Sequence, residues 1–140
     1  MGYTNQIVNP RWYLLDSAHI TDVMSGLTHE LQLKNANAKR WCCMTCKAFI
    51  TDDAFIVHID GNHEHIKVNP QGHTFQFRSY KHTQGCECWG LATAEHSWFS
   101  GYSWQFAHCA MCHTQLGWYF SGSDSFFGLI ADQIVQCAAE

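Results

Sequence analysis

Hydrophobic and polar residues alternate along several stretches of the chain, which is the period-two pattern of antiparallel β-strands with one buried face. Residues 74–78 read Thr-Phe-Gln-Phe-Arg, and residues 102–107 read Tyr-Ser-Trp-Gln-Phe-Ala. Leu116, Trp118 and Phe120 fall on one face of a third such stretch. The pattern predicts a domain made mostly of antiparallel strands.

Two apolar runs and two turn signals extend this prediction. Residues 54–59 are largely apolar and indicate a further strand, and residues 126–130 form a last apolar segment. Asp-Gly-Asn at 60–62 closes the first run, and Asn-Pro-Gln-Gly at 69–72 predicts a turn between two later strands.

The pattern differs in residues 1–41, a polar leader that contains apolar residues at helical spacing. These residues are Ile20, Val23, Met24, Leu27 and Leu31. The spacing is compatible with one amphipathic helix that covers an edge of the core. We therefore divide the chain into a leader, 1–41, and a domain, 42–140.

Two Cys-x-x-Cys pairs, Cys43 with Cys46 and Cys109 with Cys112, stand far apart in the sequence. This spacing presents two thiolates from a tight turn, and two such turns supply the four sulfur ligands of a structural zinc ion. A preformed site exists only in the folded state, so metal binding stabilises a small core. The sequence predicts one structural Zn²⁺ per chain.

The remaining four cysteines are expected to lie outside the metal site. Cys42 adjoins the first pair but breaks its spacing, so we interpret it as a bystander. Cys86, Cys88 and Cys137 have no partner at metal spacing and are expected to behave as small apolar residues. Pairs that bind metal favour a reducing compartment, although an oxidised Cys86–Cys88 pair in a secreted chain stays an alternative. The His63-Glu64-His65 stretch is expected to be a solvated turn, with weak metal chelation by its two histidines as the alternative.

Charge and hydropathy exclude several classes of function. The formal net charge is −4, and four zinc-bound thiolates would take it to about −6, so nucleic acid is not an expected partner. No apolar run approaches the length of about 20 residues that spans a bilayer, and no basic, apolar secretion signal opens the chain. We expect a soluble, cytoplasmic protein, with secretion as the alternative.

Three tryptophans, Trp98, Trp104 and Trp118, lie close together in the sequence. An indole is too large to be buried completely in a small core, and its N–H needs a partner. A cluster of three is better accommodated as the wall of a cleft than as core.

At these residues the chain resembles the CULT family, the thalidomide-binding domain of cereblon. The shared pattern is H-S-W-F-x-G-Y-x-W from His96, then C-x-x-C, then G-W-x-F from Gly117. The resemblance runs from about Cys42 to Val135 and includes the His63 and Asn69 motifs, which are similar to those of bacterial single-domain members.

The resemblance implies a β-tent, two antiparallel sheets pinned by a four-cysteine zinc site. It implies a cage of Trp98, Trp104 and Trp118 that binds a glutarimide or related cyclic imide, such as thalidomide-like ligands, uridine-like metabolites or C-terminal cyclic imides on proteins. In the family the residue matching His96 offers its carbonyl and side chain, and the residue matching Trp98 offers its backbone N–H. The expected ligand-binding set is Asn69, Pro70, Phe75, Glu95, His96, Ser97, Trp98, Trp104, Trp118 and Phe120.

The resemblance does not extend to the parts of cereblon that join a ubiquitin ligase adaptor, so we expect a stand-alone binding module without that partner. Two alternatives stay open. A methionine sulfoxide reductase shares the two cysteine pairs but needs a nucleophilic thiol, for which Cys86, Cys88 and Cys137 are the candidates. An aromatic cage also binds methylated ammonium groups, with Glu95 as the nearby carboxylate. We expect a binding protein rather than an enzyme.

Overall fold

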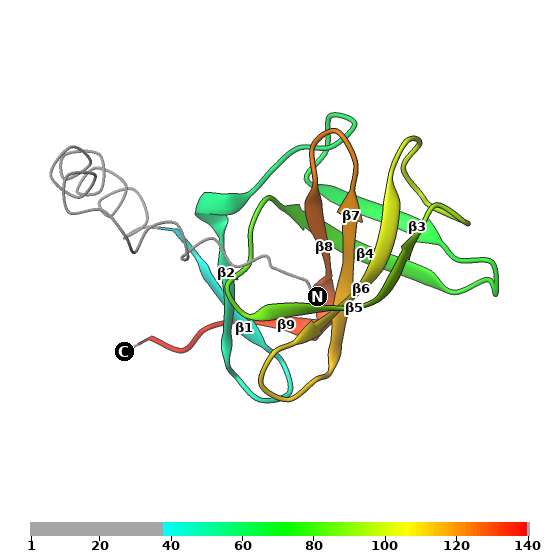
Figure 1. Ribbon diagram of the computed structural model, residues 1–140. Helices are drawn as coiled ribbons and strands as arrows, with labels where there is room; N and C mark the ends of the chain where they lie inside the picture. Colours follow the sequence, from blue (N-terminus) through cyan, green and yellow to red (C-terminus); the bar gives the residue numbers. More distant parts are fainter. Residues whose placement is uncertain (1–37, 140) are drawn as a thin grey trace, which may run out of the picture.

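Residues 38–139, which the computed structural model describes, form nine strands in two antiparallel sheets (Figure 1). The predicted leader helix lies outside these residues. A three-stranded sheet has the order β2-β1-β9 and a six-stranded sheet has the order β3-β4-β8-β7-β6-β5. The strand bounds are β1 Arg40–Cys43, β2 Phe49–Asp52, β3 Glu64–Val68, β4 Thr74–Tyr80, β5 Cys86–Thr93, β6 Ser103–Cys109, β7 Gln115–Ser121, β8 Phe126–Ile130 and β9 Ile134–Gln136. The all-β prediction is confirmed.

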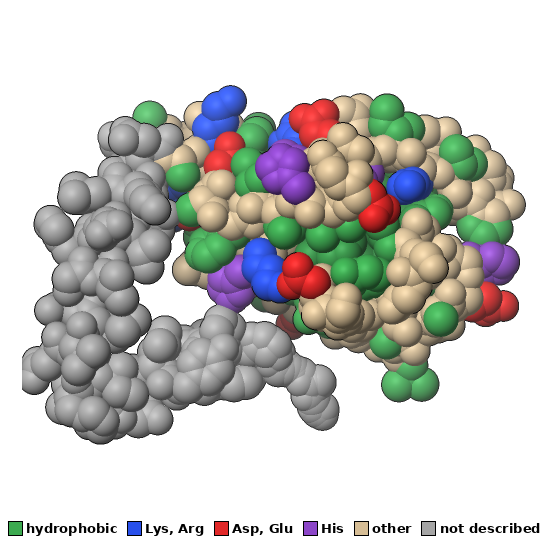
Figure 2. Space-filling model, turned by 90° about the horizontal axis from the view of Figure 1, so that it is seen from above, with side chains coloured by type: hydrophobic (Ala, Val, Ile, Leu, Met, Phe, Trp, Pro, Cys, Tyr) green, Lys and Arg blue, Asp and Glu red, His purple; other side chains and the backbone are tan. Residues whose placement is uncertain are grey.

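The buried side chains form two groups, of which only the first contains residues of both sheets. One surrounds Cys43, Tyr80 and Cys109 near the cysteine pairs, and the other is largely aromatic and includes Phe77 and Phe120. Figure 2 shows hydrophobic side chains gathered in a hollow on one face, with charged and histidine side chains around it. The aromatic group lies beneath the candidate binding pocket described below.

The three strands with alternating sequence are present as predicted. Leu116, Trp118 and Phe120 of β7 are all buried, whereas Tyr119 between them is partly exposed. The turn at 69–72 is also confirmed, because the Gly72 N–H donates to the Asn69 carbonyl across 2.9 Å.

The strand predicted over 54–59 is wrong. The Asp52 side chain accepts a hydrogen bond of 2.8 Å from the Ala54 N–H and begins a short 3-10 helix, η2, at Asp53–Phe55. After it Ile56 and Ile59 form only isolated bridges, to Tyr80 and Asn62 respectively. The hydrogen bond from the Ala54 N–H to the Asp52 side chain therefore favours a helical turn here over the strand that the apolar run predicts.

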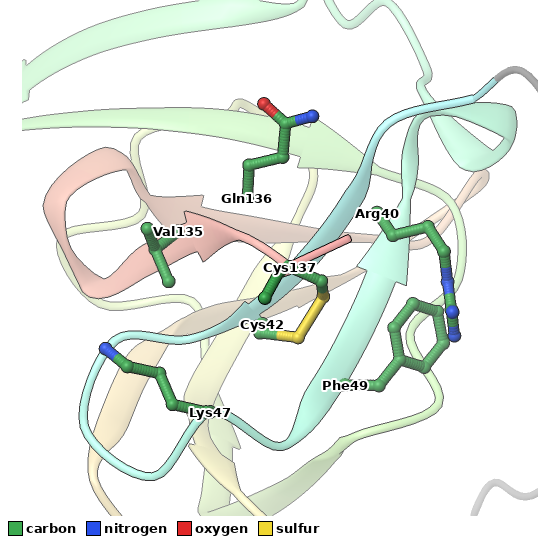
Figure 3. A pocket seen from close by; sticks show the side chains of 8 residues that line it. Arg40, Cys42, Lys47, Phe49, Val135, Gln136 and Cys137 are labelled. Carbon is green, nitrogen blue, oxygen red and sulfur yellow. A yellow bond between two sulfur atoms is a disulfide. The ribbon is translucent and has the colours of Figure 1, made fainter. Parts of the chain in front are cut away.

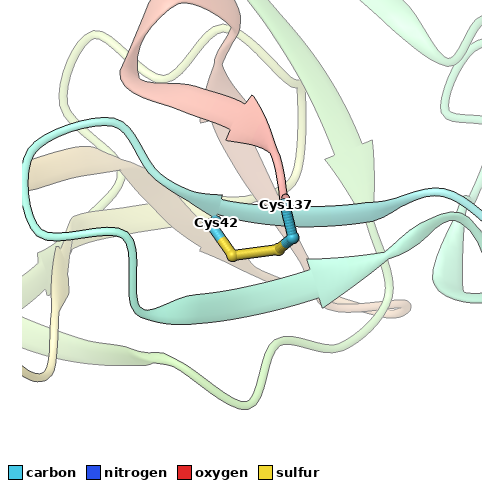
Figure 4. The surroundings of a disulfide bond; sticks show 2 residues. All are labelled: Cys42 and Cys137. Carbon is cyan, nitrogen blue, oxygen red and sulfur yellow. A yellow bond between two sulfur atoms is a disulfide. The ribbon is translucent and has the colours of Figure 1, made fainter. Parts of the chain in front are cut away.

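Cys42 and Cys137 form a disulfide that joins β1 to the end of β9 (Figure 4). The expectations that Cys42 is a bystander and Cys137 a small apolar residue are wrong. Adjacent residues of a strand point to opposite faces, so Cys42 faces away from the site of Cys43. Cys86 and Cys88 are free thiols.

His65 does not lie in a solvated turn. It belongs to β3, pairs with Phe77 of β4 and is only 7% exposed. Among residues 38–139 no helix is long and apolar enough to cross a membrane.

Candidate functional site

The two Cys-x-x-Cys pairs meet where the β1–β2 turn approaches the β6–β7 turn, at the lower edge of Figure 1. Their four sulfur atoms lie within 4.8 Å of one another. The Sγ atoms of Cys43 and Cys112 are 3.7 Å apart, and those of Cys46 and Cys109 are 3.6 Å apart. These four cysteines could therefore hold a metal ion.

The two turns share one hydrogen-bonding scheme. The Lys47 N–H donates to the Cys43 carbonyl and the His113 N–H donates to the Cys109 carbonyl, each across 2.9 Å. Both donors have left-handed backbones, with φ of 67° for Lys47 and 66° for His113. The backbone N–H of the first cysteine in each pair donates to the carbonyl of the residue after this left-handed position, Ala48 for Cys43 and Thr114 for Cys109. The sequence repeat is thus a structural repeat that presents two sulfurs from each turn.

The donor set suits a thiophilic ion. A tetrahedral Zn–S₄ centre with bonds of about 2.3 Å has sulfur–sulfur edges of about 3.8 Å, close to the separations found here. Hydrogen bonding from Thr114 lowers the pKa of Cys112 to about 6, whereas burial raises the pKa of Cys109. Metal binding needs thiolates, and a cation among the four sulfurs supplies the charge that favours them.

An open pocket of about 370 Å³ lies at the other end of the six-stranded sheet. Strands β6 and β7 supply neighbouring rings on one face, because Trp104 is paired with Phe120 and Phe106 with Trp118. The β3–β4 turn and the loop before β6 supply the remaining walls. The lining residues are Asn69, Pro70, Gln71, Phe75, His96, Trp98, Trp104, Phe106, Gln115, Trp118 and Phe120.

The rings meet one another edge to face. The centroids of Trp98 and Trp118 are 4.9 Å apart with their planes at 84°, and those of Phe75 and Trp118 are 5.1 Å apart at 79°. Perpendicular contacts of this kind favour a fixed arrangement of aromatic rings. Trp118 is buried to 7% exposure, while Trp98 and Trp104 are partly exposed.

Two of the three indole N–H groups are tied to the backbone. Trp98 Nε1 donates to the Val68 carbonyl across 2.9 Å, which links the loop before β6 to the end of β3. Trp104 Nε1 donates to the Glu95 carbonyl across 2.8 Å, which links β6 to the same loop. These bonds supply the partners that the indole N–H groups were expected to need, and they fix both rings.

His96 stands at the rim in a left-handed conformation, with φ of 60°. A non-glycine residue in this region is uncommon and carries a conformational cost that the surrounding loop must offset. Ser97 stabilises the loop, since its hydroxyl donates to the Phe99 carbonyl and accepts from the Phe99 N–H.

The chain is 34% identical over 56 residues to cereblon of Gallus gallus, which is 40% of this chain and 13% of that protein. It is 35% identical over 54 residues to cereblon of Danio rerio and 32% identical over 54 residues to cereblon of Xenopus tropicalis. This chain is a partial homologue of cereblon. The match spans 12 to 13% of the length of these relatives and 39 to 40% of this chain, and no family model matches it. The resemblance to a CULT-like domain is confirmed to this extent.

Most residues expected from the cereblon resemblance come together around the pocket. Eight of the ten line it, and Glu95 and Ser97 do not. Glu95 instead accepts the Trp104 indole N–H through its carbonyl, and its side chain is 78% exposed. Whether the lining residues bind a ligand stays a prediction.

Three lining residues were missed from the sequence, namely Gln71, Phe106 and Gln115. Phe106 follows Trp104 at a period of two on β6, so strand alternation alone places both rings on one face. Gln71 belongs to the turn at 69–72, of which only Asn69 and Pro70 were expected to bind a ligand.

A second hollow, of about 480 Å³, lies over the three-stranded sheet beside the disulfide (Figure 3). Its two cations are already engaged. The Arg40 guanidinium lies 4.2 Å from the Phe49 ring centroid, and Lys47 Nζ donates to the Met44 carbonyl across 2.7 Å. Figure 3 shows Lys47 and Arg40 at opposite sides of the disulfide, so they do not converge on one ligand.

Proposed function

We propose that this chain is a cereblon-like binding module whose tryptophan-lined pocket takes a glutarimide or related cyclic imide. The observation that carries the proposal is the convergence of Trp98, Trp104 and Trp118 on one open pocket, with His96 at its rim. Aromatic walls remove water from the apolar edge of a small ring, while a few polar groups orient it.

The polar groups that an imide needs are present beside these walls. Among residues 38–139, the Trp98 backbone N–H finds no acceptor and the His96 carbonyl receives no hydrogen bond. An imide offers carbonyl acceptors on either side of one N–H donor, so it complements a free N–H and a free carbonyl. A ligand of this size is expected to bind with about 7 to 8 kcal/mol, which corresponds to micromolar dissociation.

We further propose that the four cysteines bind one structural Zn²⁺. Four thiolates at tetrahedral spacing leave no open coordination position, which is typical of a structural rather than a catalytic zinc site. The ion would hold the β1–β2 turn against the β6–β7 turn. The chemistry of ligand binding would belong to the aromatic pocket alone.

The pocket favours a neutral ligand over a methylated ammonium group. No carboxylate is among its lining residues in the described part of the chain, and the Glu95 side chain points to solvent with 78% exposure. A cation would therefore rely on ring faces alone.

The thiols do not favour a reductase. Burial raises the pKa of Cys86 to about 12, so it is not a thiolate at neutral pH, whereas Cys88 does not line the pocket and Cys137 is held in the disulfide. We propose a non-enzymatic role, with a cyclic imide or an imide-bearing protein C-terminus as partner and no ubiquitin ligase adaptor. The disulfide favours an oxidising compartment over the cytoplasmic one expected from the metal-binding pairs.

Tryptophan fluorescence during titration with thalidomide tests the proposal. We expect quenching with a micromolar dissociation constant. The analogue methylated at the imide nitrogen should cause no quenching, because methylation removes the N–H that would donate to the His96 carbonyl. A trimethylammonium compound titrated in parallel should not bind. Equal affinity for thalidomide and its N-methyl analogue would contradict the proposal.

A further inference from the structure

His65 lies behind the aromatic pocket and does not line it. Its Nε2 is 3.3 Å from the Ser79 hydroxyl, and that hydroxyl donates to the Val57 carbonyl across 2.8 Å. Since the hydroxyl proton is used there, Ser79 accepts from the imidazole, which places a proton on Nε2. The ring is therefore held in one orientation on β3.

From this position His65 reaches the pocket through one side chain. The imidazole is stacked on Phe77, with centroids 5.2 Å apart and planes at 23°, and Phe77 is stacked on Trp98 at 5.5 Å and 19°. Phe77 is fully buried, so it has no space to move independently of the two rings. Phe99 meets the imidazole edge-on at 5.3 Å.

The surroundings of His65 favour the neutral ring. Burial lowers its pKa below the ordinary value of 6.5, and the positive charge of Lys67 and the neighbouring His63 act in the same direction. Asp60 and the Asn62 backbone favour the charged ring instead, but their effect on the pKa is weaker than that of the burial. The groups that face it from the other packed elements are uncharged: Phe77 and Ser79 of β4, and Phe99 of the loop before β6.

We infer that His65 is a positioning residue for the aromatic pocket, whose neutral imidazole supports Trp98 through Phe77. Its effect on a ligand rests on the proposed function, whereas its effect on Trp98 does not. Trp98 is the wall that links β3 to the loop before β6, so a change in its support alters the pocket as a whole.

The sign of the pH dependence follows from the burial. Because the folded-state pKa is lowered, the neutral ring and full affinity are present above about pH 6.5 and are lost as the pH falls through the folded-state pKa. A charged ring cannot stay between Phe77 and Phe99 without water, so Phe77 and Trp98 lose their support. The dissociation constant then rises by at most about tenfold for each pH unit below that pKa.

Two measurements on residues 1–140 test the inference between pH 7.5 and 5. The first follows the Trp98 indole and His65 imidazole resonances by NMR without ligand, and we expect both to titrate with one midpoint. The second measures the thalidomide dissociation constant over the same range, and we expect weaker binding in acid with that same midpoint. Circular dichroism at each pH verifies that the protein stays folded.

Two variants complete the design. His65→Phe keeps a stacked ring but does not titrate, so its Trp98 resonance and its affinity should not follow pH. His82→Gln is the matched control, because burial also lowers the pKa of His82 but its ring packs on Phe55, away from the pocket. It should keep the wild-type pH profile.

Each outcome decides between the two proposals. A Trp98 resonance that stays unchanged while His65 titrates, or follows a midpoint other than that of His65, overturns the inference, and this comparison needs no variant. A thalidomide affinity that does not change as the pH passes through the His65 midpoint found by NMR overturns it while leaving the imide proposal intact. Coupled resonances with no thalidomide binding at any pH leave the inference standing and overturn the imide proposal.

Discussion

At the scale of single residues, the pocket depends on side chains that are fixed before any ligand arrives. Trp98 and Trp104 are tied by their indole N–H groups to the backbone, and Trp118 is held between Trp98 and Phe75. A preformed wall loses little conformational entropy on binding, which favours affinity for a small ligand.

Replacing Trp104 with alanine removes one wall and also leaves the Glu95 carbonyl without its donor. We expect a loss of about 2 to 4 kcal/mol in binding, which is roughly a 30- to 1,000-fold rise in the thalidomide dissociation constant by calorimetry. Tyr119→Ala is the control, because Tyr119 points to the opposite face of β7 and packs on Phe127. Wild-type affinity in Trp104→Ala would show that this residue is not part of the binding wall.

At the scale of elements, close approach between strands brings the aromatic layer under the pocket. Gly128 of β8 has Phe77 and Phe120 over it, and a Cβ placed there would lie 2.8 Å from Phe77 Cδ2 and 3.1 Å from Phe120 Cε2. Only glycine at this position allows both rings to reach the floor beneath Trp98 and Trp118.

Gly128→Ala should therefore lower the free energy of unfolding by about 1 to 3 kcal/mol through overpacking. Urea unfolding measures this loss, and thalidomide affinity should fall with it because Phe77 shifts against Trp98. In a Phe77→Leu background the alanine should cost less, since the clashing ring edge is gone. An equal cost in both backgrounds would contradict the proposed contact.

The disulfide between β1 and the end of β9 acts on the unfolded chain. It closes a loop with a sequence separation of 95, for which the chain-entropy estimate is about 4 to 5 kcal/mol. The double replacement Cys42→Ser with Cys137→Ser should lower stability to urea by up to that amount. Cys88→Ser, which removes an exposed free thiol, serves as the control and should have little effect.

The strand alternation and the cysteine spacing were sufficient to predict β4, β6, β7 and the four-cysteine cluster, because both are local patterns with one structural meaning. The Cys42–Cys137 bond was not predictable from spacing, since it depends on which strands become neighbours. The 3-10 helix at Asp53–Phe55 depends on a cap that overrides an apolar run. The prediction that His65 lies in a solvated turn was wrong because its burial arises from the pairing of β3 with β4. The polar His63-Glu64-His65 sequence does not indicate that pairing.

At the scale of the whole molecule, the four-cysteine cluster and the pocket are joined by β6. This strand carries Trp104 near its beginning and Cys109 at its end, while Cys43 ends β1 of the other sheet and Cys46 lies in the β1–β2 turn. An ion bound to all four cysteines would thus fix one sheet against the other. It would also fix the end of β6, the strand that carries Trp104.

We expect about one zinc per chain by elemental analysis, and loss of tertiary structure after its removal by a chelator under non-reducing conditions. Near-ultraviolet circular dichroism reports this loss through the clustered aromatic rings. Cys109→Ser should have the same effect, because Cys109 is fully buried and bonded into the cluster. A chelated protein with an unchanged spectrum and thermal midpoint would contradict a structural role for the metal.

The disulfide also determines how the domain carries mechanical load. Cys42 and Cys137 stand near the two ends of the described region, and a covalent bond connects them directly. Tension applied between those ends passes through the start of β1 to Cys42, across the bond to Cys137 and on to the residues after it, so the 94 residues between the two cysteines are shielded from it. A pulling force would extend only the outer segments and leave the four-cysteine cluster and the tryptophan pocket unstretched until a covalent bond broke.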